Sequence, residues 1–196
     1  MKKGMIALLV VLGFFVLLFF WGTGQYNGMV KSEENVTKSW ANVESQYQRR
    51  SDLIPNLVST VKGYAKHEEG TLTAVIEARA KATQTTIDPT NMTEESMAKF
   101  QSAQSGVTSA LGRLLVTVEQ YPDLKANQNF LELQAQLEGT ENRISVERQR
   151  FNADAQGFNT MIRTFPKNVI AGMFGFEKKA YFQAEEGSDQ APKVEF

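Results

Sequence analysis

Few residues of this sequence have side chains that suit catalysis or metal binding. His67 is the only histidine, and the chain has no cysteine, which excludes disulfides, a thiol nucleophile and thiolate metal ligands. His67 precedes Glu68 and Glu69. Three side chains that are adjacent in sequence cannot all point at a single metal ion, so we interpret this group as a solvated helix face. No glycine-rich phosphate loop of the expected spacing occurs. We therefore expect no metal, no cofactor and no catalytic residue.

Carboxylates offer the remaining route to an enzyme. Glu141, Glu147 and Asp154 lie along one segment that we predict to be helical. If they converged in a concave pocket, the chain would be an envelope enzyme or a protease regulator with its site on the long C-terminal helix. This is the alternative to the non-enzymatic function that we favour below.

A charged cluster precedes Pro55 and contains Arg49, Arg50 and Asp52. Arg50 falls on the apolar stripe of its predicted helix, and Glu147 and Asp154 fall on the corresponding stripe of a later helix. A buried charge is costly unless it is paired. We therefore predict a polar network that sets the register between the two helices, with these members: Arg50, Asp52, Asn56, Glu147, Arg148, Asn152 and Asp154.

An uncharged apolar run from Met5 to Trp21 follows Lys2 and Lys3. At about 1.5 Å per residue it spans about 25 Å, and extension to Gly24 gives about 30 Å, the thickness of a bilayer core. We predict an uncleaved anchor over residues 1–24; a cleaved signal remains the alternative, although its apolar region is usually shorter. The two lysines on the short N-terminal side favour a cytoplasmic N-terminus, with a single pass through the cell membrane and the domain outside the cytoplasm.

The rest of the chain has helical periodicity and no convincing strand alternation, so we predict an all-α class. Residues 25–165 should form an elongated antiparallel bundle of three long helices, followed by a short C-terminal element. We expect the first helix to continue from the anchor to about Thr83, with its register unbroken at Pro55. The alternative is a reversal between Ser51 and Pro55, which gives four helices.

The second and third helices have clear start and stop signals. Thr93, followed by two glutamates, suits the N-terminus of the second helix, and Tyr121 and Pro122 mark its end. The third, from about residue 124 to 165, carries an apolar residue at every seventh position. These residues are Phe130, Leu137, Ile144, Phe151, Phe158 and Phe165.

Helix lengths predict uncovered apolar surface at both ends of this bundle. If the second helix runs antiparallel along the first, it reaches only the part beyond about Leu57, and the third helix overshoots the bundle. The resulting surface should be covered by the C-terminal segment or by association between chains. It comprises Val36, Trp40, Val43, Tyr47, Phe158 and Phe165.

The C-terminal part, residues 166–196, joins an apolar stretch to a polar tail that we expect to be mobile unless a partner holds it. Its last residues are Val194, Glu195 and Phe196. An apolar, polar, apolar ending with a free carboxylate suits capture by a peptide-binding groove. Val194 and Phe196 are therefore candidate contacts with a partner, against the alternative that the tail folds back on its own bundle.

Several segments of the chain resemble the LemA family. The likeness is carried by SWANVESQYQRRSDLIPNLVSTVKGYAKHE (39–68), TENRISVERQRFN (140–152), FNTMIRTFP (158–166) and the terminal PKVEF. The resemblance implies a bacterial membrane protein with one N-terminal span and a helical-bundle domain, and it supplies no catalytic residues. It also implies that the short N-terminus lies outside the cell, opposite to the orientation that Lys2 and Lys3 favour.

Charge and composition limit the classes of partner that we expect. A formal net charge of -1 gives no basic field, so nucleic acid is not expected as a partner. The expected partners are the lipid bilayer, other copies of the chain in a homo-oligomer, and other envelope proteins. We therefore predict a membrane-tethered helical scaffold or adaptor that self-associates, binds envelope proteins and has no catalysis of its own.

Overall fold

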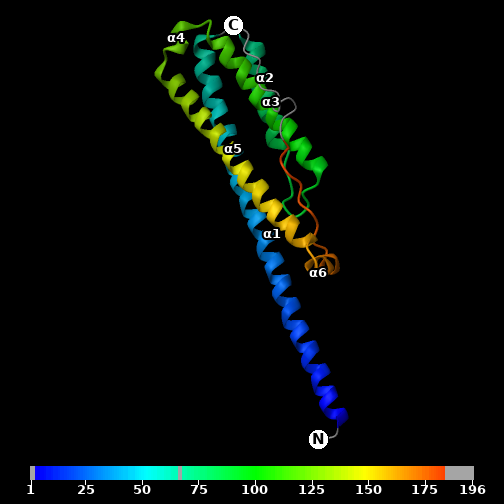
Figure 1. The fold of residues 1–196 in the computed structure, drawn as a ribbon. Helices are drawn as coiled ribbons and strands as arrows, with labels where there is room; N and C mark the ends of the chain where they lie inside the picture. The colour runs from blue at the N-terminus through cyan, green and yellow to red at the C-terminus, as the bar shows by residue number, and fades with distance from the viewer. Residues whose placement is uncertain (1–2, 66–67, 184–196) are drawn as a thin grey trace, which may run out of the picture.

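The described part of the chain forms six helices in a long, narrow arrangement (Figure 1). The computed structural model describes residues 3–65 and 68–183, and no strand occurs within these ranges. The helices are α1 (Lys3–Tyr64), α2 (Glu69–Gln84), α3 (Glu94–Val118), α4 (Pro122–Lys125), α5 (Gln128–Arg163) and α6 (Lys167–Phe174). The predicted all-α class, with an apolar N-terminal helix continuing into a helical bundle, is confirmed.

Helix α1 unites the apolar N-terminal run with the bundle. It has 62 residues, so it is about 93 Å long at about 1.5 Å per residue. Its apolar N-terminal window is wholly unburied, and it is the one helix of the described chain that is long and apolar enough to cross a membrane. From Met29 onwards, one face of the same helix is buried. The bundle therefore begins only a few residues beyond the end of the apolar run.

Pro55 lies inside α1 without ending it. Proline has no backbone N–H, so the carbonyl four residues earlier, that of Ser51, loses its helical donor. The Nε–H of Arg79 on α2 donates to this carbonyl over 2.8 Å. Because Ser51 is buried, water cannot readily donate to this carbonyl in place of the missing backbone N–H, and Arg79 does so instead.

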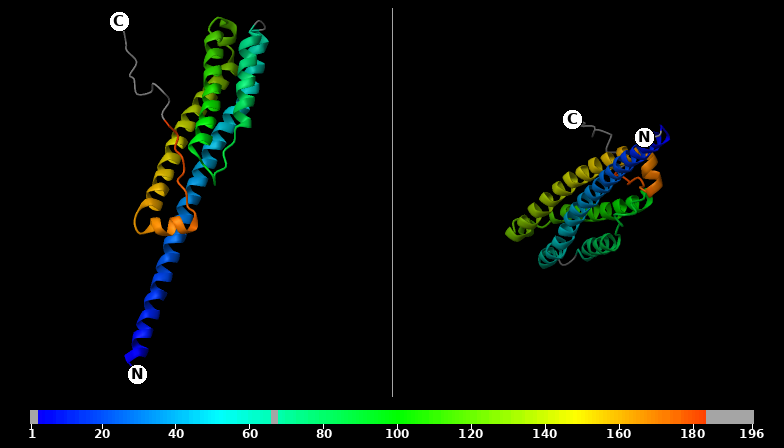
Figure 2. Two further views of the ribbon diagram at one scale, coloured as in Figure 1. Left: turned by 90° about the vertical axis from the view of Figure 1, so that its right-hand side faces the viewer. Right: turned by 90° about the horizontal axis from the view of Figure 1, so that it is seen from below.

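The first helix does not extend to Thr83 as predicted. It ends at Tyr64, and α2 begins at Glu69 and runs back (Figure 2). The chain does reverse, but beyond Tyr64 and not between Ser51 and Pro55. The reversal brings Leu72 and Val75 of α2 into the same core as Leu57 of α1, which a straight helix would have left uncovered.

The bundle therefore has four long helices in up-down-up-down order, with α1 packed mainly on α5 and α2 mainly on α3. The second predicted helix, α3, runs in the same direction as α1; its antiparallel neighbour is α2. Its N-terminus was predicted correctly: the Thr93 side chain accepts from the Ser96 backbone N–H, and the Ser96 hydroxyl accepts from the Thr93 N–H. This reciprocal pair fixes where α3 begins.

Helix α5 keeps its register through Gly139 and Gly157, as predicted, and ends at Arg163. Ile144, Phe151 and Phe158 are buried along its length. Phe165, the last member of the seven-residue series, follows the end of the helix and is exposed. The start also differs from the prediction, because the separate turn α4 precedes α5.

The predicted bare stripe is buried inside the chain itself. Val36, Trp40, Val43 and Tyr47 belong to a core with the lower half of α5 and the start of α3. Residues 176–183, which we call the return segment, complete the cover: they run back up from α6, and the Phe182 ring stacks on Trp40 with centroids 5.9 Å apart. We expected this surface to be covered either by the C-terminal segment or by association between chains. The structure shows the C-terminal segment folded back over it as far as Gln183.

Candidate functional site

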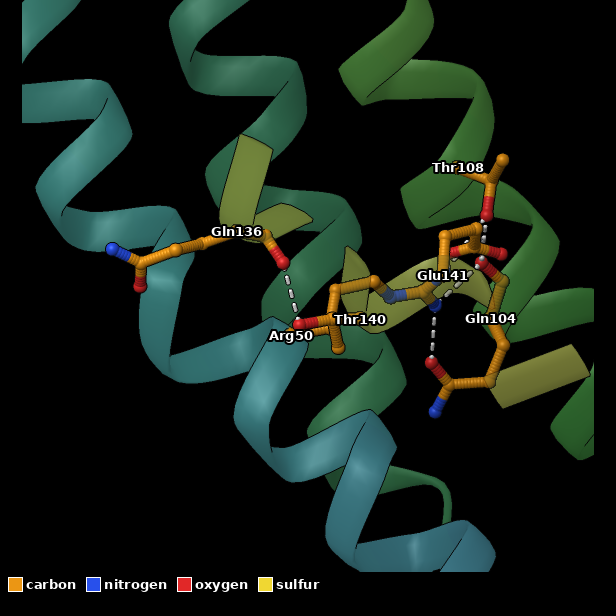
Figure 3. Close-up of polar contacts among 6 residues, drawn as sticks. All are labelled: Arg50, Gln104, Thr108, Gln136, Thr140 and Glu141. Atoms are coloured by element: carbon orange, nitrogen blue, oxygen red, sulfur yellow. Dashed lines mark hydrogen bonds and ion pairs between the residues drawn. The ribbon is translucent and has the colours of Figure 1, made fainter. Parts of the chain in front are cut away.

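Arg50 is the most buried charge in the middle of the bundle, with its side chain 3% exposed. Its Nη1 donates to Thr108 Oγ1 over 2.9 Å and to Glu141 Oε2 over 2.8 Å (Figure 3). Its Nη2 donates to Gln104 Oε1 over 2.8 Å and to the Gln104 carbonyl over 3.2 Å. One guanidinium therefore joins α1, α3 and α5.

The helices present these acceptors because of simple spacing. Gln104 and Thr108 are four residues apart and lie on the same face of α3. Glu141 follows Thr140, a buried core position of α5 whose hydroxyl donates to the Gln136 carbonyl over 2.7 Å. The Glu141 side chain is 49% exposed, so it reaches Arg50 from the edge of the core while keeping contact with water.

Two neighbouring pockets between α3 and α5 flank this pair, and Arg50 of α1, Thr108 and Glu141 line both of them. The part nearer the N-terminal apolar run has a volume of about 570 Å³ and a polar lining that includes Gln101, Ser105 and Arg148. The distal part, of about 210 Å³, is almost wholly apolar. Leu57, Leu111, Leu115 and Leu137 line this distal part, and Glu138 and Glu141 stand beside it. We call the two parts together the α3–α5 groove.

The predicted polar network is only partly assembled. The partner of Arg50 is Glu141, not Glu147 or Asp154. Glu147 accepts from Arg150, three residues along the same helix, over 2.6 Å, and Asp154 is exposed. Asp52 and Asn56 are also exposed; Asp52 accepts from Gln48 Nε2 over 2.8 Å. These four residues therefore do not contribute to the pair in the groove.

Arg148 and Asn152, the other predicted members, hold the return segment instead. The Asn152 side-chain amide donates to the Phe182 carbonyl and accepts from the Phe182 N–H, both over 2.9 Å. The Arg148 guanidinium lies 4.7 Å from the centre of the Phe182 ring. These contacts fasten residue 182 above Trp40.

Asn159, one heptad further along α5, repeats this arrangement and was not predicted. Its amide donates to the Lys179 carbonyl over 2.8 Å and accepts from the Lys179 N–H over 2.9 Å. The Lys179 ammonium is buried and lies 2.7 Å from Glu33 of α1. The only sequence signal for this clamp is the seven-residue spacing of Asn152 and Asn159.

The candidate carboxylates do not form a catalytic set. Glu141, Glu147 and Asp154 are six and seven residues apart on one straight helix, about 9 Å and 10 Å along its axis. Among residues 3–65 and 68–183, no group of three or more His, Asp or Glu side chains is placed to hold a metal ion. The two pockets beside Arg50 include Glu141 but neither Glu147 nor Asp154, so these pockets do not bring the three carboxylates together.

Two other sequence-predicted groups lie partly or wholly outside the described residues. His67 is one of these, while its neighbour Glu68 accepts a hydrogen bond from the Tyr121 hydroxyl over 2.9 Å. This bond raises the pKa of Tyr121 and ties the α1–α2 reversal to the end of α3. Val194, Glu195 and Phe196 are also outside the described residues.

One acidic group below the groove has a shifted pKa. Burial raises the pKa of the Glu44 carboxyl, and the nearby Trp40 side chain offsets part of the effect. Glu44 lines a small cavity of about 80 Å³ on the α2 side of Arg50. It faces away from the α3–α5 groove, so we interpret the shift as a consequence of packing.

Comparison with known proteins gives a consistent identification. Protein LemA of Metamycoplasma hominis is 27% identical over 182 residues, which cover 88% of this chain and 80% of that protein. Magnetosome protein MamQ 2 of Paramagnetospirillum magneticum is 28% identical over 182 residues, covering 84% and 67%. Magnetosome protein MamQ of Magnetospirillum gryphiswaldense is 26% identical over 208 residues, covering 96% and 76%.

None of these names denotes an enzyme. The family profile covers the bundle from Ser39 onwards, including the Arg50 pair, the groove and the return segment. Because the LemA family profile matches residues 39–196, the chain belongs to the LemA family.

Proposed function

We propose that this chain is a membrane-tethered adaptor, without catalysis of its own, that binds a helix of another envelope protein in the α3–α5 groove. The observation that carries the proposal is the groove itself, whose apolar distal part lies between two long helices beside the Arg50–Glu141 ion pair. Amphipathic helices dock in such grooves through side chains spaced three and four residues apart.

The charges beside the groove indicate the chemistry of the partner. Glu138 is exposed and Glu141 half-exposed at the rim of the distal part. Arg50 satisfies only one oxygen of Glu141. A helix with an apolar face flanked by lysine or arginine would complement this rim, whereas an acidic helix would be repelled.

The continuous helix α1 supports a tethering role. It would carry the groove away from the membrane at a fixed height, because no linker interrupts Lys3–Tyr64. On the charge of Lys2 and Lys3, we place the groove outside the cytoplasm. Since the chain lacks cysteine, a single cysteine at exposed Ile76 should react with a membrane-impermeant maleimide in intact cells; protection until lysis would reverse this orientation.

Site-specific photocrosslinking in intact membranes tests the groove. A photoreactive residue at Leu115, in the groove, should give one discrete product with a second protein, and the same residue at Ile76, on α2, should not. The crosslinked segment, mapped by mass spectrometry, should be an amphipathic helix with a basic flank. Glu138→Lys should lower the yield several-fold, whereas the matched reversal Glu77→Lys on α2 should leave it unchanged.

Three results would overturn the proposal. The first is equal crosslinking from Leu115 and Ile76, and the second is equal sensitivity to Glu138→Lys and Glu77→Lys. The third is a product made only of two copies of this chain, which would assign the groove to the self-association that the sequence suggested.

A further inference from the structure

Helix α6 and the preceding Phe165 present an apolar surface that the bundle leaves largely exposed. Val169 and Met173, four residues apart on α6, are 54% and 75% exposed, and Phe174 is 61% exposed. Phe165, which lies between α5 and α6, is 79% exposed. On the opposite side, Ala171 is buried and Ile170 packs against the core. We call the four exposed side chains the α6 apolar face.

The position of α6 relative to the anchor is fixed by ring contacts. The Phe174 and Phe176 rings lie 4.8 Å and 5.7 Å from the ring of Tyr26 on α1. Tyr26 is two residues beyond Gly24, the end of the predicted anchor, which is about 3 Å along the helix axis. The α6 apolar face therefore lies at the height where α1 would leave the hydrocarbon core.

The direction of α6 also suits a membrane surface. It lies across α1 at the lower end of the bundle and not along it (Figure 2). If α1 crosses the bilayer, α6 lies nearly in the plane of the headgroups. Short amphipathic helices in this position bury their apolar face at the boundary between headgroups and acyl chains.

The charges around α6 favour a lipid surface over a second protein. Arg163 and Lys167 flank its start and Lys178 follows its end, whereas Glu177 is the one acidic residue between positions 163 and 178, so basic groups outnumber acidic ones around the helix. Lysine and arginine at this height can extend to lipid phosphates. Tyr26 and Trp21 on the adjoining part of α1 are residues that prefer the same boundary.

We propose that α6 is an interfacial membrane-docking helix, which inserts Phe165, Val169, Met173 and Phe174 into the outer part of the leaflet from which α1 emerges. The bundle would then be held to the bilayer at two points, α1 and α6. The inference rests on α1 being a membrane anchor, and it is independent of the partner proposed for the groove.

Depth-dependent fluorescence quenching of the full chain in nanodiscs tests this proposal. Three single-cysteine variants of the cysteine-free chain would carry an environment-sensitive dye at Met173, at Ile76 of α2, and at Phe14 of the anchor. We expect the Met173 label to be quenched by lipids with a nitroxide near the headgroup, and to be several-fold less accessible to iodide than the Ile76 label. Phe165→Ser with Val169→Ser, both at exposed positions, should raise iodide access at Met173 several-fold.

The design separates the possible failures. Equal iodide quenching at Met173 and Ile76, with the Phe14 label still shielded, would overturn α6 docking and leave the anchor intact. A Phe14 label open to iodide would overturn the anchor and the docking together. Protection of Met173 that disappears when each nanodisc holds a single chain would assign the α6 apolar face to a second copy and overturn the proposal.

Discussion

Replacing Arg50 by methionine tests whether the buried ion pair holds the α3–α5 groove together. Methionine keeps most of the side-chain volume but removes all five N–H donors. The Gln104 side-chain oxygen, in a buried residue, loses its charged donor, and a buried acceptor without a partner costs about 1–3 kcal/mol. Loss of the guanidinium 5.1 Å from the Tyr47 ring centre adds about 1 kcal/mol.

Loss of the remaining Arg50 contacts adds little to the free-energy cost of the substitution. Thr108 keeps a weaker hydrogen bond to the Gln104 carbonyl, and the half-exposed Glu141 carboxylate regains water. We therefore expect Arg50→Met to lower the free energy of unfolding of the bundle by about 2–4 kcal/mol. For a domain of this size, that corresponds to a fall in Tm of about 5–15 °C.

Thermal and urea unfolding in mild detergent, followed by circular dichroism, would measure the effect. The double variant Arg50→Met with Gln104→Leu should recover about 1–2 kcal/mol, because the oxygen that lost its donor is removed as well. Arg113→Met, at an exposed position of α3, is the matched control and should change stability by less than about 0.5 kcal/mol. The reasoning is refuted if Arg50→Met behaves like the control, or if the double variant is no more stable than the single one.

Three further predictions concern other parts of the bundle. Arg79→Met should destabilise by about 1–2 kcal/mol in the natural chain but by less than about 0.5 kcal/mol together with Pro55→Ala, since alanine restores the helical donor to the Ser51 carbonyl; a thermodynamic cycle showing equal costs in both backgrounds would contradict this. Asn159→Ala should cost about 2–4 kcal/mol by unpairing the Lys179 backbone, with faster hydrogen exchange in residues 176–183 as the readout and unchanged exchange as the negative result. The raised pKa of Glu44 means that the folded state binds the proton of this carboxyl more tightly than the unfolded state does, so stability falls as pH rises from the pKa of the unfolded state through the higher pKa of the folded state. Glu44→Gln should therefore raise Tm slightly at pH 7 and not at pH 4. A gain in Tm at both pH values would exclude this cause.

The helical class and several boundaries could be predicted because they depend on local chemistry. Thr93 begins a helix because its hydroxyl caps an N–H nearby in sequence. The buried positions Ile144, Phe151 and Phe158 follow from helical spacing alone. Such signals require no knowledge of what lies opposite.

The direction of each helix could not be predicted in the same way. Apolar positions at steps of three and four fit a helix that continues past Tyr64 and a helix that reverses there equally well, because the period carries no information on direction. The uncovered surface around Trp40 was therefore predicted from a wrong arrangement, although fold-back of the C-terminal part was among the outcomes that it allowed.

The partner of Arg50 was missed for a related reason. The seven-residue repeat selects residues by the position of their Cα atoms on the helix, and it pointed to Glu147 and Asp154. Glu141 stands one position away from the core residue Thr140 and reaches Arg50 only because its side chain is long and half-exposed. Asn152 and Asn159 bind backbone groups of an extended segment, and such an interaction leaves no periodic pattern in the sequence.

The uninterrupted course of α1 has a mechanical consequence. If the apolar run of α1 spans a bilayer, the same rigid helix forms the span and one wall of the bundle, so a change in its tilt must move the far end of the molecule. Thinner bilayers tilt long apolar helices more strongly. Lipid composition would in this way set the tilt of the bundle. It would also set the angle at which the distal end presents itself to a neighbouring protein; by the rise of an α-helix, this end lies some tens of ångströms from the membrane surface.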